Sequence, residues 1–246
     1  MRTIHIYFVT GASKGIGRAL YEQLQIDGNI VIGLARTNPN RASRFVEVDL
    51  TSSSHLDELL TEQIAEWKEQ ATSFTLINNA GTVEPIGVMG TIDSDNIDTA
   101  YRLNVIAPLL LTNVFIRELK DFEGEKKVLN ISSGAGRNAY EGWGVYCSTK
   151  AAIDHFSVVV AKEQASSSHP VKIVSIAPGI IDTEMQKTIR NSDEEKFPLH
   201  EKFVTYKDQG LLSSAEETAE KLITFMNLAD FGQQNVLSDI REVKLD

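Results

Sequence analysis

The stretch TGASKGIG, residues 10–17, follows a mostly apolar run at residues 4–9 and precedes apolar residues at helical spacing. The run predicts a strand buried on both faces, and the spacing predicts a helix. Glycines let the backbone approach a ligand, and the first turn of a helix offers free N–H groups to a phosphate. The stretch therefore fits a nucleotide phosphate site, and it fits equally a tight turn whose glycines serve only packing. A Walker loop is excluded because Gly-Lys-Ser/Thr is missing at the required spacing.

Strand-like and helix-like patterns alternate along the rest of the chain. Further strands are expected at residues 29–35, 45–48, 74–77, 127–131, 171–177 and 236–240. Such alternation predicts an α/β fold, a Rossmann-type doubly wound parallel sheet flanked by helices on both faces. The chain of 246 residues shows no repeat or interdomain linker, so we expect a single domain. Its cofactor half would span about 1–125, and its active-site and substrate half about 126–246.

Two helical regions carry more specific expectations. A hydroxyl among residues 51–54 should cap the helix that follows. A long helix at residues 97–119 contains Pro108, which should bend or divide it. Asn104 lies within the apolar pattern of the same helix, either as a structural group that satisfies nearby backbone or as a catalytic amide.

Composition narrows the class of protein. A net charge of −10 argues against a nucleic-acid partner. The first apolar run is too short for a signal peptide, and no stretch approaches the length of a membrane span. The single cysteine, Cys147, cannot form an internal disulfide, which fits a reducing cytoplasm, and nothing marks it as an activated nucleophile. The five histidines share no metal-ligand spacing, so we expect no metal site.

The end of the second strand bears on cofactor choice. An NAD site typically carries Asp or Glu there to bind the ribose 2′-hydroxyl, but this chain has Arg36. Arg36 and Lys14 would meet a 2′-phosphate, or both would be solvated surface charges. We therefore predict NADP(H). Asp49, after the third strand, would either accept a hydrogen bond from adenine or start the next turn.

Three residues in the second half suggest acid–base chemistry. Tyr146 and Lys150 are one helical turn apart, so their side chains share a face. An ammonium about 4 Å from the phenol would contribute on the order of 4 kcal/mol and lower the pKa of the phenol by about three units. Ser133, at the end of the strand at 127–131, would polarise a carbonyl oxygen by a hydrogen bond.

Six motifs occur in the order found in the short-chain dehydrogenase/reductase family, and the resemblance covers essentially the whole chain. They are Thr10-Gly11 with Gly15 and Gly17, the Asn-Asn-Ala-Gly turn at 78–81, Asn104, Ser133, Tyr146-x-x-x-Lys150, and Pro178-Gly179. Within the family, residues 142–147 and 182–186 resemble the sepiapterin reductase branch. They look most like bacterial benzil reductases of the (S)-benzoin-forming type.

The resemblance implies roles for four catalytic residues. Tyr146 would give its proton to the carbonyl oxygen as hydride arrives from the nicotinamide. Lys150 would lower the pKa of the tyrosine and hold the nicotinamide ribose. Ser133 would hold the carbonyl oxygen, and Asn104 would position a water in the proton relay.

The resemblance also implies binding residues. Those expected to bind NADP(H) are Gly11, Ser13, Lys14, Gly15, Ile16, Gly17, Arg36, Asp49, Leu50, Asn79, Ala80, Gly81, Tyr146, Lys150, Pro178, Gly179, Ile181 and Thr183. Those expected near the substrate are Ser133, Trp143, Tyr146, Gly179, Met185 and Asp239. Asp239 would anchor a pterin or equally cap the last strand. The loosely patterned stretch 184–210 would be a mobile lid, or a surface insertion with no gating role.

The expected function is that of a cytoplasmic, NADPH-dependent carbonyl reductase acting on an aromatic or α-dicarbonyl compound such as benzil. One alternative is a sepiapterin-type reductase of pterin diketones. An alternative of another class is a non-catalytic NADP(H)-binding redox sensor, since fold alone does not imply catalysis. We expect a small-molecule substrate, neither nucleic acid nor membrane as partner, and a homodimer or homotetramer formed through helices at about 96–119 and 148–165.

Overall fold

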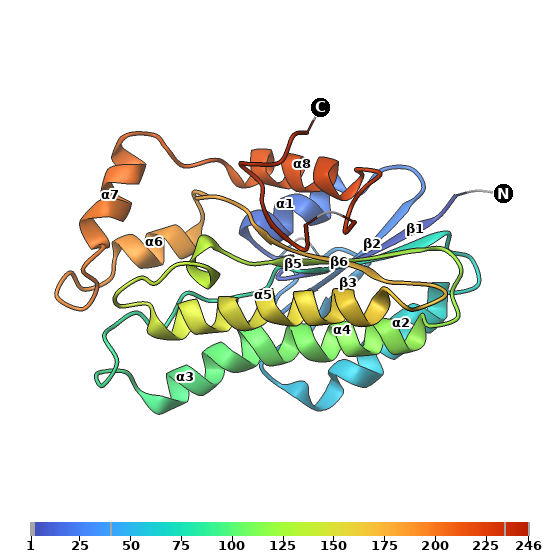
Figure 1. Ribbon diagram of the computed structural model, residues 1–246, viewed down its shortest axis with the longest axis horizontal. Helices are drawn as coiled ribbons and strands as arrows, with labels where there is room; N and C mark the ends of the chain where they lie inside the picture. The colour runs from blue at the N-terminus through green and yellow to red at the C-terminus, as the bar shows by residue number, and fades with distance from the viewer. Residues whose placement is uncertain (1–2, 40, 234, 246) are drawn as a thin grey trace.

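The computed structural model describes residues 3–39, 41–233 and 235–245. Within them, one parallel sheet of seven strands has the order β3-β2-β1-β4-β5-β6-β7 (Figure 1). The strands are β1 His5–Thr10, β2 Asn29–Ala35, β3 Phe45–Glu47, β4 Ser73–Asn78, β5 Glu125–Ile131, β6 Lys172–Ala177 and β7 Leu237–Asp239. The predicted α/β doubly wound sheet is confirmed.

The strand order reverses at β1, which pairs with β2 on one side and β4 on the other. Val9 lies opposite Gly33 of β2 and Ile77 of β4. In doubly wound sheets, ligands bind outside the carboxyl ends of the strands at such a reversal. The loops that follow β1 and β4 both begin there, so the fold brings the two glycine-containing turns together.

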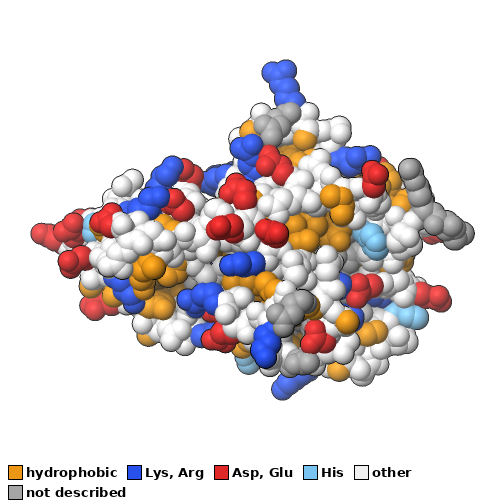
Figure 2. Space-filling model, turned by 90° about the horizontal axis from the view of Figure 1, so that it is seen from above, with side chains coloured by type: hydrophobic (Ala, Val, Ile, Leu, Met, Phe, Trp, Pro, Cys, Tyr) orange, Lys and Arg blue, Asp and Glu red, His pale blue; other side chains and the backbone are white. Residues whose placement is uncertain are grey.

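Helices cover both faces of the sheet (Figure 1). The helices α1 Gly15–Gln23 and α8 Ala215–Met226 pack together on one face. The helices α2 Leu56–Trp67, α4 Ala107–Glu118 and α5 Gly144–Gln164 cover the other. Their apolar faces cover the central strands, most of whose residues are buried, whereas the edge strands β3 and β7 stay partly exposed. On the face that carries α1 and α8, basic and acidic side chains intermingle (Figure 2).

The long central helix is divided as predicted. It consists of α3 Ser94–Tyr101, a π-helical turn Arg102–Ile106 and α4. Pro108 is the second residue after this turn. Because proline has no N–H for an i→i−4 bond, a wider turn before it lets the helix continue without that bond.

The helical segments run on as one stretch, Ser94–Glu118, of 25 residues, which is long and apolar enough to cross a membrane. The expectation that no stretch approaches this length is therefore wrong. Half of its most apolar window is buried inside the protein. Leu111, Val114 and Phe115 pack in the core beside α2, which is the arrangement of a core helix.

Two local expectations differ from the structure, and a third segment, whose role as a lid stays a prediction, contains helices that its pattern did not indicate. No serine hydroxyl caps α2, because a 3₁₀ turn, Ser53–His55, precedes it and the N-cap is His55. The helix expected from about residue 148 begins at Gly144. The stretch 184–210 contains two helices, α6 Glu184–Arg190 and α7 His200–Asp208.

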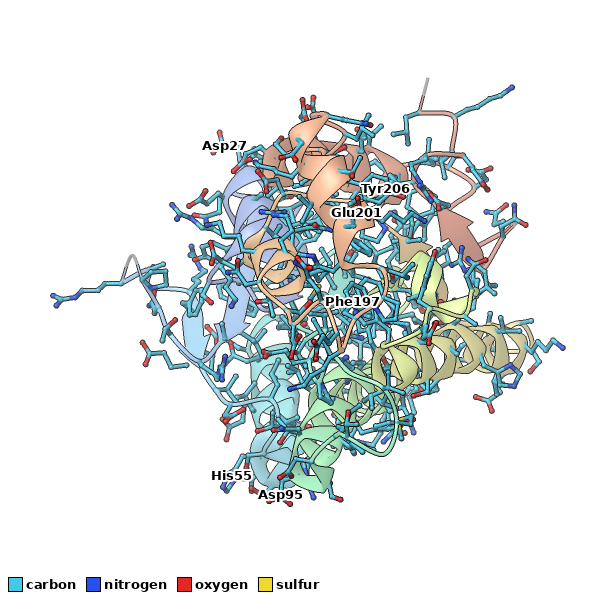
Figure 3. The ribbon with its side chains drawn as sticks, turned by 90° about the vertical axis from the view of Figure 1, so that its left-hand side faces the viewer. Asp27, His55, Asp95, Phe197, Glu201 and Tyr206 are labelled. Atoms are coloured by element: carbon cyan, nitrogen blue, oxygen red, sulfur yellow. The ribbon has the colours of Figure 1, made fainter. Side chains whose placement is uncertain are left out.

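The helices α6 and α7 lie beyond the carboxyl ends of the strands, at the left of Figure 1. Figure 3 looks onto this end, with Phe197 near the middle of the view and Tyr206 above it on α7. Phe197 is fully buried and stacks on Trp143 with 5.0 Å between ring centroids. The stretch 184–210, whose sequence periodicity is weak, is thus packed against the start of α5 by this aromatic contact.

Candidate active site

The first glycine turn is tightly packed against the second. Gly11 has φ +68°, a left-handed conformation that favours glycine, and a Cβ there would lie 2.9 Å from Asn79 Nδ2. A Cβ on Gly17 would lie 2.3 Å from the Gly11 carbonyl oxygen, so no larger residue fits. Gly17 therefore serves packing, whereas Gly11 and Gly15 line a cavity. The packing interpretation is confirmed for Gly17, and the phosphate site stays a prediction.

The N-terminal end of α1 faces this cavity. Gly15 and Ile16 of its first turn line the cavity wall. No side chain caps the helix, and its first turn has no acidic residue. The partial positive charge of the helix end is thus left for a ligand, which suits a phosphate.

Thr10 joins the two turns, and the sequence analysis assigned it no role of its own. Its Oγ1 accepts hydrogen bonds from the backbone N–H groups of Asn79 (2.9 Å) and Ala80 (3.0 Å). Asn79 Nδ2 donates to the Thr10 carbonyl at 2.9 Å. The one signal for this role is the position of a hydroxyl residue at the end of the central strand.

The cavity has a volume of about 840 Å³ and runs across the carboxyl ends of the strands. It brings together the predicted residues Gly11, Ser13, Lys14, Gly15, Ile16, Arg36, Asp49, Leu50, Asn79, Ala80, Gly81, Ser133, Trp143, Tyr146, Lys150, Pro178, Gly179, Ile181, Thr183 and Met185. Three predicted residues, Gly17, Asn104 and Asp239, are not part of its lining.

Ser133, Tyr146 and Lys150 meet beside the end of β5. Tyr146 and Lys150 lie on α5 with only 7% and 6% of their surface exposed. Lys150 Nζ donates a hydrogen bond of 2.8 Å to the carbonyl of Ile131, the last residue of β5. Ser133 Oγ accepts from the Ala135 N–H at 3.1 Å, which fixes the hydroxyl at the start of a 3₁₀ turn.

The sequence predicts a lowered pKa for Tyr146, and the structure contradicts this. Burial raises the pKa of Tyr146 to about 12, and the Ser133 hydroxyl acts weakly in the opposite direction. Burial also lowers the pKa of Lys150 to about 8, against the opposing effect of the Asp154 carboxylate. The spacing of the two residues indicated their proximity but not their loss of solvent, and loss of solvent dominates. The phenol therefore stays protonated throughout the neutral range.

Asn104 is occupied by structural hydrogen bonds. Its Oδ1 accepts from the Thr82 N–H at 2.8 Å, and its Nδ2 donates to the Thr82 carbonyl at 2.8 Å and to Thr149 Oγ1 at 3.1 Å. This matches the structural alternative, because the amide fixes the backbone just after the second glycine turn. The water-positioning role of Asn104 stays a prediction.

Asp239 is paired rather than free. Its carboxylate accepts from Arg241 Nε at 2.8 Å and from Arg241 Nη2 at 2.5 Å. Arg241, which the sequence analysis missed, lines the cavity in its place. Arg241, rather than the predicted Asp239, is thus the residue of this pair that lines the cavity.

The opposite end of the cavity carries the residues expected at the adenosine part of the cofactor. Lys14 and Arg36 both line it. Asp49 Oδ1 accepts hydrogen bonds from the N–H (2.9 Å) and the hydroxyl (2.8 Å) of Thr51, which lower the pKa of Asp49, with a smaller contribution from Arg36. The turn-forming role of Asp49 is confirmed, while contact with adenine stays a prediction.

Aromatic side chains surround the substrate end. Trp143 lies 5.4 Å from the ring of Tyr146, 5.0 Å from Phe203 and 5.7 Å from Tyr140, measured between centroids. Tyr140, Phe203 and Tyr206 all line the cavity, and none was predicted as a site residue. They show no common periodic pattern in the sequence, because they come from a loop and from α7 rather than from one regular element.

A glycine turn at the sheet's reversal point and a Ser–Tyr–Lys group at the next strand ends define an oxidoreductase that uses NAD(P). Residues 5–194 match the family model for short chain dehydrogenases. The chain belongs to the short-chain dehydrogenase/reductase family.

Individual relatives narrow the comparison. Benzil reductase ((S)-benzoin forming) of Bacillus cereus is 36% identical over 240 residues, which cover 93% of this chain and 96% of the relative. Sepiapterin reductase of Meriones unguiculatus is 30% identical over 244 residues, covering 91% of each chain. The crystal structure of a short chain dehydrogenase/reductase from Saccharomyces cerevisiae is 27% identical, covers 98% of both chains and superimposes with a TM-score of 0.80.

Proposed function

We propose that the protein is an NADPH-dependent carbonyl reductase that acts on aromatic ketones or α-dicarbonyl compounds such as benzil. The observation that carries this proposal is the placement of Ser133, Tyr146 and Lys150 in one cavity with an aromatic end. Similarity to a benzil reductase over nearly the whole chain supports the same reaction class.

The residues present fit the cofactor. The glycine turn leaves the backbone of Gly11 and Gly15 open to a diphosphate, and Thr183 lies across from Gly15, 3.3 Å from where a Cβ would stand. Lys14 and Arg36 would hold a 2′-phosphate, which supports NADPH over NADH. When bound, the dihydronicotinamide supplies the hydride.

The chain's own residues would complete the reaction. The Ser133 hydroxyl would donate a hydrogen bond to the carbonyl oxygen and so polarise the bond. The Tyr146 phenol, kept protonated by burial, would transfer its proton to that oxygen as hydride reaches the carbon. The Lys150 ammonium would hold the ribose and oppose the negative charge that develops on the phenol.

A sepiapterin-type reduction is the nearest alternative and is favoured by the 30% identical sepiapterin reductase. It needs a group that receives hydrogen bonds from the pterin ring. Asp239 was the candidate, but Arg241 already occupies its carboxylate. A non-catalytic sensor would have no use for a buried phenol aimed at a serine. We therefore favour reduction of aromatic dicarbonyls.

The direct test is oxidation of NADPH by the purified protein with benzil, 1-phenyl-1,2-propanedione, sepiapterin and simple monoketones, with NADH as control. We expect turnover of the aromatic dicarbonyls at the highest kcat/KM. Turnover of sepiapterin alone would replace the proposed substrate class. Tight NADPH binding without turnover of any carbonyl would favour the sensor.

The pH profile is a further prediction. Because the pKa of Lys150 is lowered to about 8, its ammonium is present below this pH and lost above it. Tyr146, with a pKa raised to about 12, stays protonated throughout. We expect kcat/KM for reduction to be flat through neutral pH and to fall as the pH rises past about 8. Rates measured in buffers of constant ionic strength check this, and a flat profile up to about pH 10, the ordinary lysine range, would contradict it.

A further inference from the structure

The ion pair between Asp239 and Arg241 decides which charged group is accessible to a ligand in this part of the cavity. Besides its two side-chain bonds from Arg241, Asp239 Oδ1 accepts the Arg241 backbone N–H at 3.0 Å. Only 11% of the Asp239 side chain is exposed, against 62% of the Arg241 side chain. The acid is therefore held inside the pair, and the guanidinium is the accessible group.

Arg241 lines the same cavity as Ser133 and Tyr146. Arg241 follows β7, which pairs with β6, and β6 pairs with β5, which leads to Ser133. Adjacent strands are about 4.8 Å apart, so these strand ends are about 10 Å apart. The Arg241 stem spans part of that gap, since its Cδ lies 3.8 Å from the position a Cβ on Gly179 would take.

The remaining donors of Arg241 suit a neutral oxygen. A guanidinium has five N–H donors. Two of them, on Nε and Nη2 of Arg241, donate to the Asp239 carboxylate. The pair carries no net charge, and the carboxylates Glu84 and Glu184 line the same cavity as the cations Lys202 and Arg241. The neutral pair itself would give a carboxylate ligand little net attraction, whereas a carbonyl oxygen still accepts a hydrogen bond from the guanidinium.

We propose that Arg241 is a specificity-determining residue that donates a hydrogen bond to the second oxygen of a vicinal dicarbonyl, while Ser133 and Tyr146 hold the first. Asp239 is a positioning residue that orients the guanidinium. This inference rests on the proposed reduction of dicarbonyls and explains how the enzyme separates them from monoketones.

The test compares benzil with deoxybenzoin, which has the same two rings but one carbonyl replaced by methylene. In Arg241→Gln, the ratio of kcat/KM for benzil to kcat/KM for deoxybenzoin should fall about tenfold relative to wild type, mainly through KM for benzil. Asp239→Asn should lower the ratio by a smaller factor, because the guanidinium loses its anchor. The matched control is Arg18→Gln, since Arg18 is also exposed and paired, with Glu22, but is not part of the cavity lining.

Thermal unfolding and NADPH titration of each variant show whether folding and cofactor binding are retained. If Arg241→Gln leaves the ratio of kcat/KM for benzil to kcat/KM for deoxybenzoin unchanged, the inference is wrong. This holds whether both values fall or neither does, and the assignment as a reductase is unaffected. A wild-type protein that turns over neither benzil nor 1-phenyl-1,2-propanedione overturns the substrate proposal together with the inference. A fall of about tenfold in Arg241→Gln and a smaller fall in Asp239→Asn, with no fall in Arg18→Gln, support it.

Discussion

Replacement of Tyr146 by phenylalanine is expected to lower kcat for carbonyl reduction by about 10³–10⁴-fold, near the upper range for loss of a positioned acid. The substitution removes the proton donor and keeps the ring, which packs 5.4 Å from Trp143. Among the residues that the structure describes, Tyr146 is the tyrosine that contacts both Ser133 and Lys150. Steady-state rates of NADPH oxidation with benzil measure the loss.

The variant should bind NADPH nearly as wild type does, because the glycine turns and cations that would hold the cofactor are untouched. Fluorescence titration with NADPH checks this point. Tyr101→Phe is the matched control, since it removes a phenol that donates to Ser148 Oγ at 2.9 Å and is not part of the cavity lining. Turnover at the wild-type rate by Tyr146→Phe would contradict the assignment of Tyr146 as the proton donor.

The architecture was predictable because its signals are local. The central strands contain runs of apolar residues, the clearest in β2, and turns and helices alternate with them along the chain. The glycine turn after β1 and the four-residue spacing of Tyr146 and Lys150 are also local. Such patterns follow from backbone geometry alone, so they can be recognised in the sequence before the folded structure is known.

The substrate side was harder to predict because its order comes from contacts between distant segments. Phe197 and Phe203 belong to a stretch with weak periodicity, and Trp143 orders them from the start of α5. The pairing of Asp239 with Arg241 depends on side-chain direction, which spacing does not give. The raised pKa of Tyr146 depends on burial, which only the folded chain provides.

Arg36→Asp should reverse the cofactor preference. We expect the ratio of kcat/KM with NADPH to that with NADH to fall by at least about 10²-fold, because a charge partner of the 2′-phosphate is replaced by a repelling carboxylate. The new carboxylate also stands where NAD sites carry an acid for the ribose hydroxyls, so the NADH rate should rise. Arg36 is exposed at the carboxyl end of β2, so the change should leave the thermal unfolding temperature nearly unchanged. Paired measurements with both cofactors at fixed benzil give the ratio.

The control must separate a local contact from the overall charge of the protein. Arg44→Asp makes the same change of two charge units just before β3, and Arg44 is not part of the cavity lining. If the preference for NADPH over NADH came from long-range attraction, both variants would lose it to the same extent. High salt would then also abolish the preference of the wild-type protein. A direct contact predicts that only Arg36→Asp changes the ratio. Retained NADPH preference in that variant would mean that Lys14 alone recognises the phosphate, or that the preference lies elsewhere.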